Sequence, residues 1–286
     1  MAYRSFRQFL DALEQAGELK RVAIPVDTDL LIAEWADREM KSPGGGKALL
    51  FEHPIVGWTK IQNFRLQSTR WDRADGWRLH CKSQTSQISH RRFNLSSKRN
   101  RQPICVKAGA CSNKESICCM RVQNLSAKRR ARKSCTSSAM QKPFSLRDLP
   151  ILKCWPKDGG RFITLPNVHT RDPETGARNI GIYRMQVYDE DTTAMHWQLH
   201  KVGARHGKRY YERGERMPVA VTLGGDPVYT FAATAPLPDG LDELFFAGFL
   251  RKKSIELVRC KTIDLEVPAD VDFVLEGYVQ PGEMRP

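Results

Sequence analysis

The first 63 residues show the hydrophobic periods of helices and of a buried strand. Ser5 can cap a helix that ends before Gly17. The apolar residues of this helix recur with a 3.6-residue period: Phe6, Phe9, Leu10 and Leu13. A second helix is predicted over about 30–40, followed by a glycine turn at 44–46 and a buried strand at 48–52. The pattern therefore predicts an α/β segment over residues 1–63.

From residue 142 the pattern is one of many short strands. Asp226 and Pro227 begin a short helix, and Asp239 is a candidate cap for another that runs through Leu250. A strand at 180–187 places Ile180, Ile182, Arg184 and Gln186 on one face and Gly181, Tyr183, Met185 and Val187 on the other. Further strands are predicted over 161–166, 219–223, 255–259, 264–267 and 271–279. Many strands with two short helices suit a split β-barrel over 142–286, and the chain as a whole is then α+β.

Residues 64–141 follow neither period. Only 11 of these 78 positions are Leu, Ile, Val or Phe, too few to bury a core. The segment has 18 Lys and Arg against 3 Asp and Glu, so it accounts for the whole excess behind the net charge of +14. It also holds 12 serines and six of the eight cysteines. This composition, bounded abruptly by well-patterned sequence, predicts a stretch translated out of frame that is disordered or poorly packed.

Two functional interpretations of 64–141 stay open beside that one. A basic insertion that binds RNA would use its positive charge, the run at 128–133 and the aromatic residues Trp71 and Trp77. A zinc site would use cysteines, but no pair among them has the CxxC spacing: Cys105, Cys111, Cys118 and Cys119.

Length and composition limit the class of protein. A chain of 286 residues forms one large domain or two ordinary ones. No run approaches the ~18 apolar residues of a membrane span, and the N-terminus lacks the apolar stretch of a signal peptide. A cytoplasmic, reducing location is therefore the expectation, in which the cysteines stay reduced.

Some residues in the C-terminal half have side chains that can bind metal. Asn179, His200 and Glu243 supply an amide, an imidazole and a carboxylate, a mixed N/O set that a hard divalent cation accepts. Spacing alone does not select them, because a single Glu in a helix is usually solvated. His196 and His200 are also four residues apart, but a zinc protease would have Glu at 197.

Three runs in this half resemble the UbiD family of decarboxylases. They are NIGIYRMQ at 179–186, DELFFAG at 242–248 and LEGY at 275–278, in the family's order and approximate spacing. The resemblance is strong over 144–286 and moderate over 1–60. It implies a split-barrel, flavin-reductase-like domain and non-oxidative decarboxylation of an aromatic or unsaturated acid with prenylated FMN. A prenylated hydroxybenzoate-like precursor of ubiquinone or menaquinone is the expected substrate.

The resemblance also assigns roles to individual residues. It makes Asn179, His200 and Glu243 ligands of Mn²⁺, with K⁺ as a further candidate ion. Arg184 matches an arginine that hydrogen-bonds a catalytic carboxylate near the substrate; the alternative is a strand arginine paired at the surface. The residues expected to line the flavin and its phosphate are Ile182, Tyr183, Arg184, His196, Trp197, Gln198 and Lys201.

The resemblance implies partners as well. These are a small aromatic or unsaturated acid, a flavin prenyltransferase that supplies the cofactor, and further copies of the chain in a homo-oligomer. No nucleic acid is expected, and membrane association is expected only through a lipophilic substrate. The alternatives are a basic RNA-binding protein without enzymatic activity, acting through 64–141, and a flavin-binding module without decarboxylase activity.

The same resemblance gives an expectation about activity. In the family, the two working carboxylates follow a proline that matches Pro286, so the 286-residue chain is expected to be a truncated form without decarboxylase turnover. Glu276 and Glu283 precede that pair and are interpreted as ordinary strand and turn carboxylates.

Overall fold

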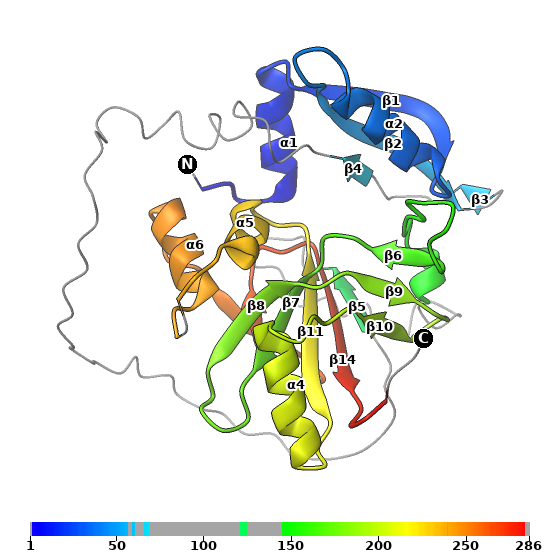
Figure 1. Cartoon of the computed structure of the whole chain (residues 1–286). Helices are drawn as coiled ribbons and strands as arrows, with labels where there is room; N and C mark the ends of the chain where they lie inside the picture. Colours follow the sequence, from blue (N-terminus) through cyan, green and yellow to red (C-terminus); the bar gives the residue numbers. More distant parts are fainter. Residues whose placement is uncertain are drawn as a thin grey trace.

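The computed structural model describes residues 2–56, 59–60, 66–68, 121–124, 145–238 and 240–283. Figure 1 shows an N-terminal α/β part above a larger β-rich part. The segment 64–141 lies outside the described residues except at 66–68 and 121–124, which form strands β4 and β5. None of the described helices has the length and apolar character that a membrane span requires.

The N-terminal part is built on two parallel strands. Helix α1 (Phe6–Gln15) starts where Ser5 Oγ accepts the Gln8 N–H at 3.3 Å, which confirms the predicted cap. Strands β1 (Leu19–Asp27) and β2 (Ala48–Val56) pair in parallel, with α2 (Leu31–Met40) between them in the chain. The short strands β3 (Thr59–Lys60) and β4 (Leu66–Ser68) pair antiparallel with β2.

Strand β1 was not predicted from hydrophobic periodicity. Its register shifts between Val22 and Pro25, and its two buried residues, Val22 and Val26, are four positions apart. Such a bulge disrupts the period-2 alternation that reveals a strand in a sequence.

The β-rich part contains a five-stranded antiparallel sheet with the order β5-β14-β11-β7-β8. Its strands are β5 (Arg121–Asn124), β7 (Asn167–Arg171), β8 (Arg178–Ile182), β11 (Met217–Leu223) and β14 (Phe273–Val279). A second sheet joins β6 (Arg161–Ile163), β9 (Met185–Val187) and β10 (Thr193–Met195), and β12 (Leu257–Arg259) pairs with β13 (Glu266–Pro268). The β-rich character is confirmed; the split barrel remains a prediction.

The single strand predicted over 180–187 is wrong. Strand β8 ends at Ile182 in the five-stranded sheet, and β9 begins at Met185 in the other sheet. Between them, the buried Tyr183 bonds to the start of α4, while Arg184 reaches a carboxylate from another loop. These two tertiary contacts redirect the chain, so Ile182 and Arg184 do not share the face of one strand.

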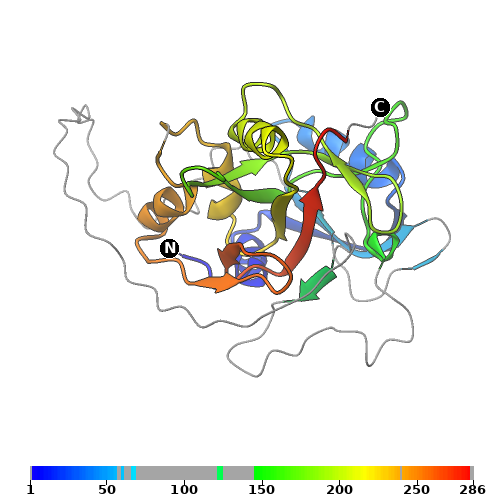
Figure 2. The ribbon, with the colours of Figure 1, turned by 90° about the horizontal axis from the view of Figure 1, so that it is seen from below.

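Three helices pack on the five-stranded sheet, which Figure 2 shows from below. Ala220 and Val274 belong to the apolar cluster with α5 (Val228–Thr234) and α6 (Glu243–Arg251), whereas Val221 and Leu275 belong to the cluster on the other face. Helix α4 (Val202–Glu212) contacts β7, β8 and β11.

The sequence predicted only two of these three helices. Helix α4 was missed because its sequence, VGARHGKRYYE, is mostly polar and contains two glycines. Helix α5 begins one residue later than predicted. The predicted cap of α6 is wrong: Asp242 Oδ1 accepts the Leu244 N–H at 2.7 Å, and Asp239 lies outside the described residues.

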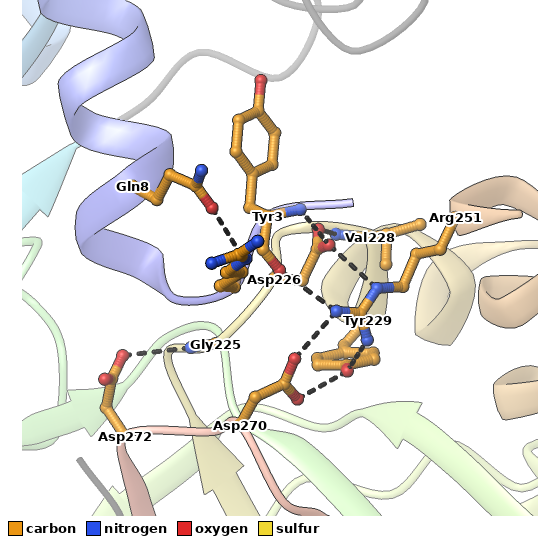
Figure 3. A network of polar contacts seen from close by, with 10 residues as sticks. Tyr3, Gln8, Gly225, Asp226, Val228, Tyr229, Arg251, Asp270 and Asp272 are labelled. Carbon is orange, nitrogen blue, oxygen red and sulfur yellow. Dashed lines mark hydrogen bonds and ion pairs between the residues drawn. The ribbon is translucent and has the colours of Figure 1, made fainter. Parts of the chain in front are cut away.

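Two groups of contacts join the N-terminal part to the β-rich part. Arg161 Nη1 donates to Thr28 Oγ1 at 2.7 Å and to the Ile151 carbonyl at 2.8 Å. Near the N-terminus, Tyr3 donates its N–H to Asp226 Oδ2 at 2.9 Å, and its carbonyl accepts from Arg251 Nη2 at 3.1 Å. Figure 3 shows this second group, in which the first residues of the chain bond to a buried ion pair.

Candidate functional site

The candidate site lies along β8, the edge strand of the five-stranded sheet. Helices α4 and α6 both contact this strand. The first turn of α4 is bonded to Tyr183, just beyond the end of β8, and the first residue of α6 is bonded to Ile180. The site is therefore built from one strand and two helix N-termini that are distant in the sequence (Figure 1).

Asn179 is held by contacts to a neighbouring strand and to the chain beyond β8. Its Nδ2 donates to Thr170 Oγ1 at 3.2 Å and to Tyr183 Oη at 3.3 Å. The Tyr183 oxygen also accepts the Gly203 N–H of α4 at 3.0 Å. Thr170 Oγ1 in turn lies 3.0 Å from Nδ1 of His206. The two hydrogen bonds of the Asn179 side chain both use Nδ2, so its amide oxygen is the atom available to a ligand.

Glu243 lies against the backbone of the same strand. Its Oε2 accepts the Ile180 N–H at 3.0 Å, so its carboxylate is held beside the residue that follows Asn179. Burial raises the pKa of Glu243. A cation bound at this carboxylate would offset the cost of keeping it ionised in a partly buried position.

His200 is exposed and lies in the turn just before α4, three residues before Gly203. Asn179 thus lies on β8, and the Glu243 carboxylate at the start of α6 bonds to the backbone of the next residue, Ile180. The convergence of Asn179, Glu243 and His200 on one ion remains a prediction. No group of three or more His, Cys, Asp or Glu side chains within the described ranges is arranged to hold a metal. The set of Asn179, His200 and Glu243 differs from such a group because one of its members is an amide.

The loop before α4 contains most of the residues expected at the flavin. His196, Gln198 and Lys201 are exposed. Trp197 is half-buried, and its Nε1 is a buried donor that has no hydrogen-bond partner among the described residues. Lys201 caps α4 without a side-chain hydrogen bond to the helix. A helix start of this kind, next to a lysine, suits a phosphate group.

Two glycines allow α4 to pack closely against the site. A Cβ at Gly203 would lie 2.9 Å from Cζ of Tyr183, and one at Gly207 would lie 2.6 Å from Cζ3 of Trp197. The glycines are four residues apart, so they lie on one face of the helix and both aromatic rings contact it. Tyr183 is only 4% exposed, so much of its ring belongs to the core. Ile182, at the end of β8, is half-buried.

Sequence reasoning did not identify Thr170, His206 or the α4 glycines. Thr170 on β7 and His206 on α4 are buried polar residues. Thr170 bonds to Asn179 directly, and His206 bonds to Thr170. Burial lowers the pKa of His206. Their partners are 9 and 36 residues away in the chain, so no local spacing marks them as a pair.

Arg184 has a carboxylate partner within the chain. Its Nη2 donates to Asp158 Oδ2 at 2.8 Å and its Nη1 to Asp158 Oδ1 at 3.4 Å. Its Cζ lies 3.9 Å from the centre of the Phe162 ring. Arg184 thus has a carboxylate partner although it lies between β8 and β9, and Asp158 was not anticipated.

Glu276 is buried and fully engaged as an acceptor. Its carboxylate accepts the N–H groups of Lys261 and Thr262 and the Thr262 hydroxyl, at 2.6–3.1 Å. These bonds join the loop before β13 to β14. They match the interpretation of Glu276 as a structural carboxylate. Glu283 is exposed near the end of the described chain.

Comparison with known proteins first defines the class. Residues 126–286 match the family model described as the Rift-related domain of 3-octaprenyl-4-hydroxybenzoate carboxy-lyase, and residues 10–66 match the model of its N-terminal domain. The chain therefore belongs to the UbiD family.

Relatives agree with this placement. An uncharacterised protein of Archaeoglobus fulgidus is 41% identical over 100% of the chain and 56% of its own length, and one of Aquifex aeolicus is 38% identical over 98% and 56%. The chain thus spans about half the length of the curated relatives it matches.

Solved structures share the fold at low identity. One is the UbiD-class enzyme HmfF of Pelotomaculum thermopropionicum in complex with prenylated FMN, in an evolved dimeric form. Its TM-score is 0.69 at 22% identity, with 98% of this chain and 58% of that chain covered. Another is the closed form of the vanillic acid decarboxylase of Sedimentibacter hydroxybenzoicus, at 0.69 and 22%, with 99% and 55% covered. The apo 3,4-dihydroxybenzoic acid decarboxylase AroY of Klebsiella pneumoniae scores 0.69 at 18%, with 98% and 55% covered.

Proposed function

We propose that this chain provides the flavin- and metal-binding part of a non-oxidative decarboxylase that acts on an aromatic or unsaturated acid with prenylated FMN. The observation that carries the proposal is the set of contacts around one edge strand: β8 carries Asn179, its Ile180 N–H bonds to Glu243, and Tyr183 just beyond it bonds to the first turn of α4. The HmfF complex with prenylated FMN supports the choice of cofactor.

The metal proposal follows from the ligand atoms. The amide oxygen of Asn179 and the carboxylate of Glu243 are oxygen ligands, and the exposed imidazole of His200 precedes α4 by two residues. Such a mixed set, completed by phosphate oxygens, fits Mn²⁺. K⁺ is a second candidate for the same oxygen-rich region.

The flavin proposal follows from the donors near the start of α4. The ammonium of Lys201 and the first turn of α4, in which the Gly203 N–H already donates to Tyr183, would hold the phosphate. The buried Nε1–H of Trp197 is available to donate to the cofactor. Ile182, Tyr183, His196 and Gln198 complete the expected lining. When bound, prenylated FMN supplies the electron sink that decarboxylation of such an acid needs.

Arg184 would bind the carboxyl group of the acid. Its guanidinium stays charged, and a planar fork of donors fits a carboxylate. Phe162, stacked on one face, offers an apolar surface beside it for an unsaturated or aromatic group. A prenylated hydroxybenzoate-like quinone precursor fits this requirement, with a flavin prenyltransferase as the source of the cofactor and a homo-oligomer as the working assembly.

Binding of FMN and Mn²⁺ tests the proposal, because HmfF also has a solved complex with FMN. Mn²⁺ and FMN together should stabilise the chain, by about 2.7 kcal/mol at one hundred times the dissociation constant. Glu243→Gln should remove the Mn²⁺-dependent part of this gain. Glutamine can still accept the Ile180 N–H, so the fold contact is kept. Denaturant unfolding and calorimetric titration measure both effects.

The matched control is Glu256→Gln, the same change at an exposed residue. It should leave the response to Mn²⁺ and FMN unchanged. Equal Mn²⁺-dependent stabilisation of the wild type and Glu243→Gln would remove Glu243 from the ligand set. Absence of FMN binding by the wild-type chain with Mn²⁺ would contradict the cofactor proposal itself.

A further inference from the structure

The segment that leads into β6 surrounds the Arg184 guanidinium on several sides. Asp158 accepts hydrogen bonds from both terminal nitrogens, at 2.8 and 3.4 Å. The Phe162 ring lies under the guanidinium, with 3.9 Å from Cζ to the ring centre. Burial raises the pKa of the Cys154 thiol, and the nearby Arg184 opposes this rise. One short segment, 158–162, thus supplies a carboxylate and an aromatic face to Arg184.

Asp158 is also held by hydrogen bonds within its own loop. Its Oδ2 accepts the Trp155 N–H at 3.2 Å, and its own N–H donates to the Trp155 carbonyl at 3.1 Å. Gln186 Nε2 on β9 donates to the carbonyl of Gly159 at 3.2 Å, which ties the loop to the next strand. The Asp158 side chain is only 14% exposed. The carboxylate is therefore held by the backbone of its own loop and is largely shielded from solvent.

This arrangement leaves part of Arg184 available. The side chain is 35% exposed although its terminal nitrogens contact Asp158 and one face covers Phe162. A guanidinium has five N–H donors, and the pair with Asp158 uses two of them. The remaining donors have their directions set by the fixed pair, and holding a side chain in one rotamer lowers the entropy lost when a ligand binds.

We propose that Asp158 is a positioning residue that holds Arg184 in the orientation in which it binds the carboxylate of an acid ligand. The inference rests on the proposed function for the class of ligand. The positioning role of Asp158 can be tested separately, because it concerns how firmly the Arg184 side chain is held by a contact that the structure shows.

The test compares Asp158→Asn, Asp158→Glu and the control Asp264→Asn in the full chain with FMN and Mn²⁺. Asp264 is 90% exposed and lies 3.8 Å from Arg171, so it gives the same chemical change at a surface pair. One readout is the NMR signal of the Arg184 guanidinium, assigned with Arg184→Lys. The other is the affinity for benzoate relative to benzamide, its uncharged counterpart.

In the wild type, the pair with Asp158 should slow the rotation of the Arg184 guanidinium. Asp158→Asn should make this rotation fast. It should also weaken benzoate binding about tenfold, equivalent to about 1.4 kcal/mol, while benzamide binding changes little. Asp158→Glu should restore much of both, and Asp264→Asn should match the wild type. If Asp158 had a purely structural role, Asp158→Asn would instead weaken the binding of benzoate and benzamide alike and would lower the free energy of unfolding.

Two results would overturn the positioning role. One is an NMR signal showing that the Arg184 guanidinium rotates as slowly in Asp158→Asn as in the wild type. The other is benzoate binding that is unchanged or tighter in that variant, which would make Asp158 a bystander or a competitor for the arginine. If the wild type fails to prefer benzoate over benzamide, the proposed acid ligand is wrong, and the Arg184 signal still decides whether Asp158 orders the side chain.

Discussion

Replacing Arg251 by methionine is expected to lower the free energy of unfolding by about 3–5 kcal/mol, because the change leaves the buried Asp226 carboxylate and the partly buried Asp270 carboxylate without their counter-charge. Arg251 Nε lies 3.1 Å from Asp226 Oδ2, and its Nη2 lies 2.8 Å from Asp270 Oδ2. The Asp226 side chain is 0% exposed and that of Arg251 is 5% exposed. Methionine is an unbranched, uncharged side chain that can occupy the inner part of the space filled by the arginine stem, so the main change is the loss of the charge.

The pH dependence identifies the cause of this loss. In Arg251→Met, the buried Asp226 loses its partner while Asp270 stays near, so the pKa of Asp226 should rise above its unfolded value. A raised carboxyl pKa makes the folded state bind more protons as the pH falls, which adds stability in acid. The gap between variant and wild type should therefore be smaller at pH 4.5 than at pH 8, as urea unfolding would show.

Controls separate the ion pair from a general effect of the substitution. Arg259→Met, at an exposed position, should cost less than about 0.5 kcal/mol. The double variant Arg251→Met with Asp226→Asn should recover part of the loss, since it removes the most buried charge. A loss for Arg251→Met that does not change with pH would point to packing alone.

The same network gives the N-terminus a structural role. Asp226 accepts the N–H of Val228 at 3.1 Å at the start of α5 and the N–H of Tyr3 at 2.9 Å. Arg251, at the end of α6, also bonds to the Tyr3 carbonyl, as Figure 3 shows. The first residues of the chain thus complete a buried polar cluster of the β-rich part, and their removal should expose it.

A second large effect is expected from His169 below neutral pH. Its ring is buried between β7 and β11, with Nε2 3.0 Å from Thr222 Oγ1 and Nδ1 without a partner among the described residues. Burial, with a smaller contribution from Arg178, lowers the pKa of His169 to about 3. The unfolded chain protonates this histidine near pH 6.5, so the unfolded state binds more protons between those values.

Stability should therefore fall as the pH drops below about 6.5, and this one group should contribute about 1.4 kcal/mol for each pH unit. His169→Phe removes the titrating group and keeps a ring of similar shape. The free energy of unfolding, measured from pH 7 to pH 4.5, should decline less steeply in this variant than in the wild type.

His196→Gln is the matched control, because it removes a histidine at an exposed position. Identical slopes for the wild type and His169→Phe would show that His169 is protonated in the folded state. That result would require the unpartnered Nδ1 to find an acceptor that this structure does not show.

The sequence by itself determined the elements that depend on local pattern. Helix α1 and its Ser5 cap were predictable because a helical period and a capping side chain are properties of neighbouring residues. Strands β2, β11 and β14 were predictable because each contains several consecutive apolar residues. The family was predictable for a similar reason, since the runs at 179–186, 242–248 and 275–278 are contiguous.

Only the tertiary structure decided how the site is held together. Arg184 pairs with Asp158, which is 26 residues away, and Glu243 bonds to Ile180, which is 63 residues away. A hydrophobic period reports which positions are buried and carries no information about which polar group will face them. The break between β8 and β9 has the same origin. Tyr183 and Arg184 form hydrogen bonds with the distant residues Gly203 and Asp158, and these bonds direct the chain away from the sheet.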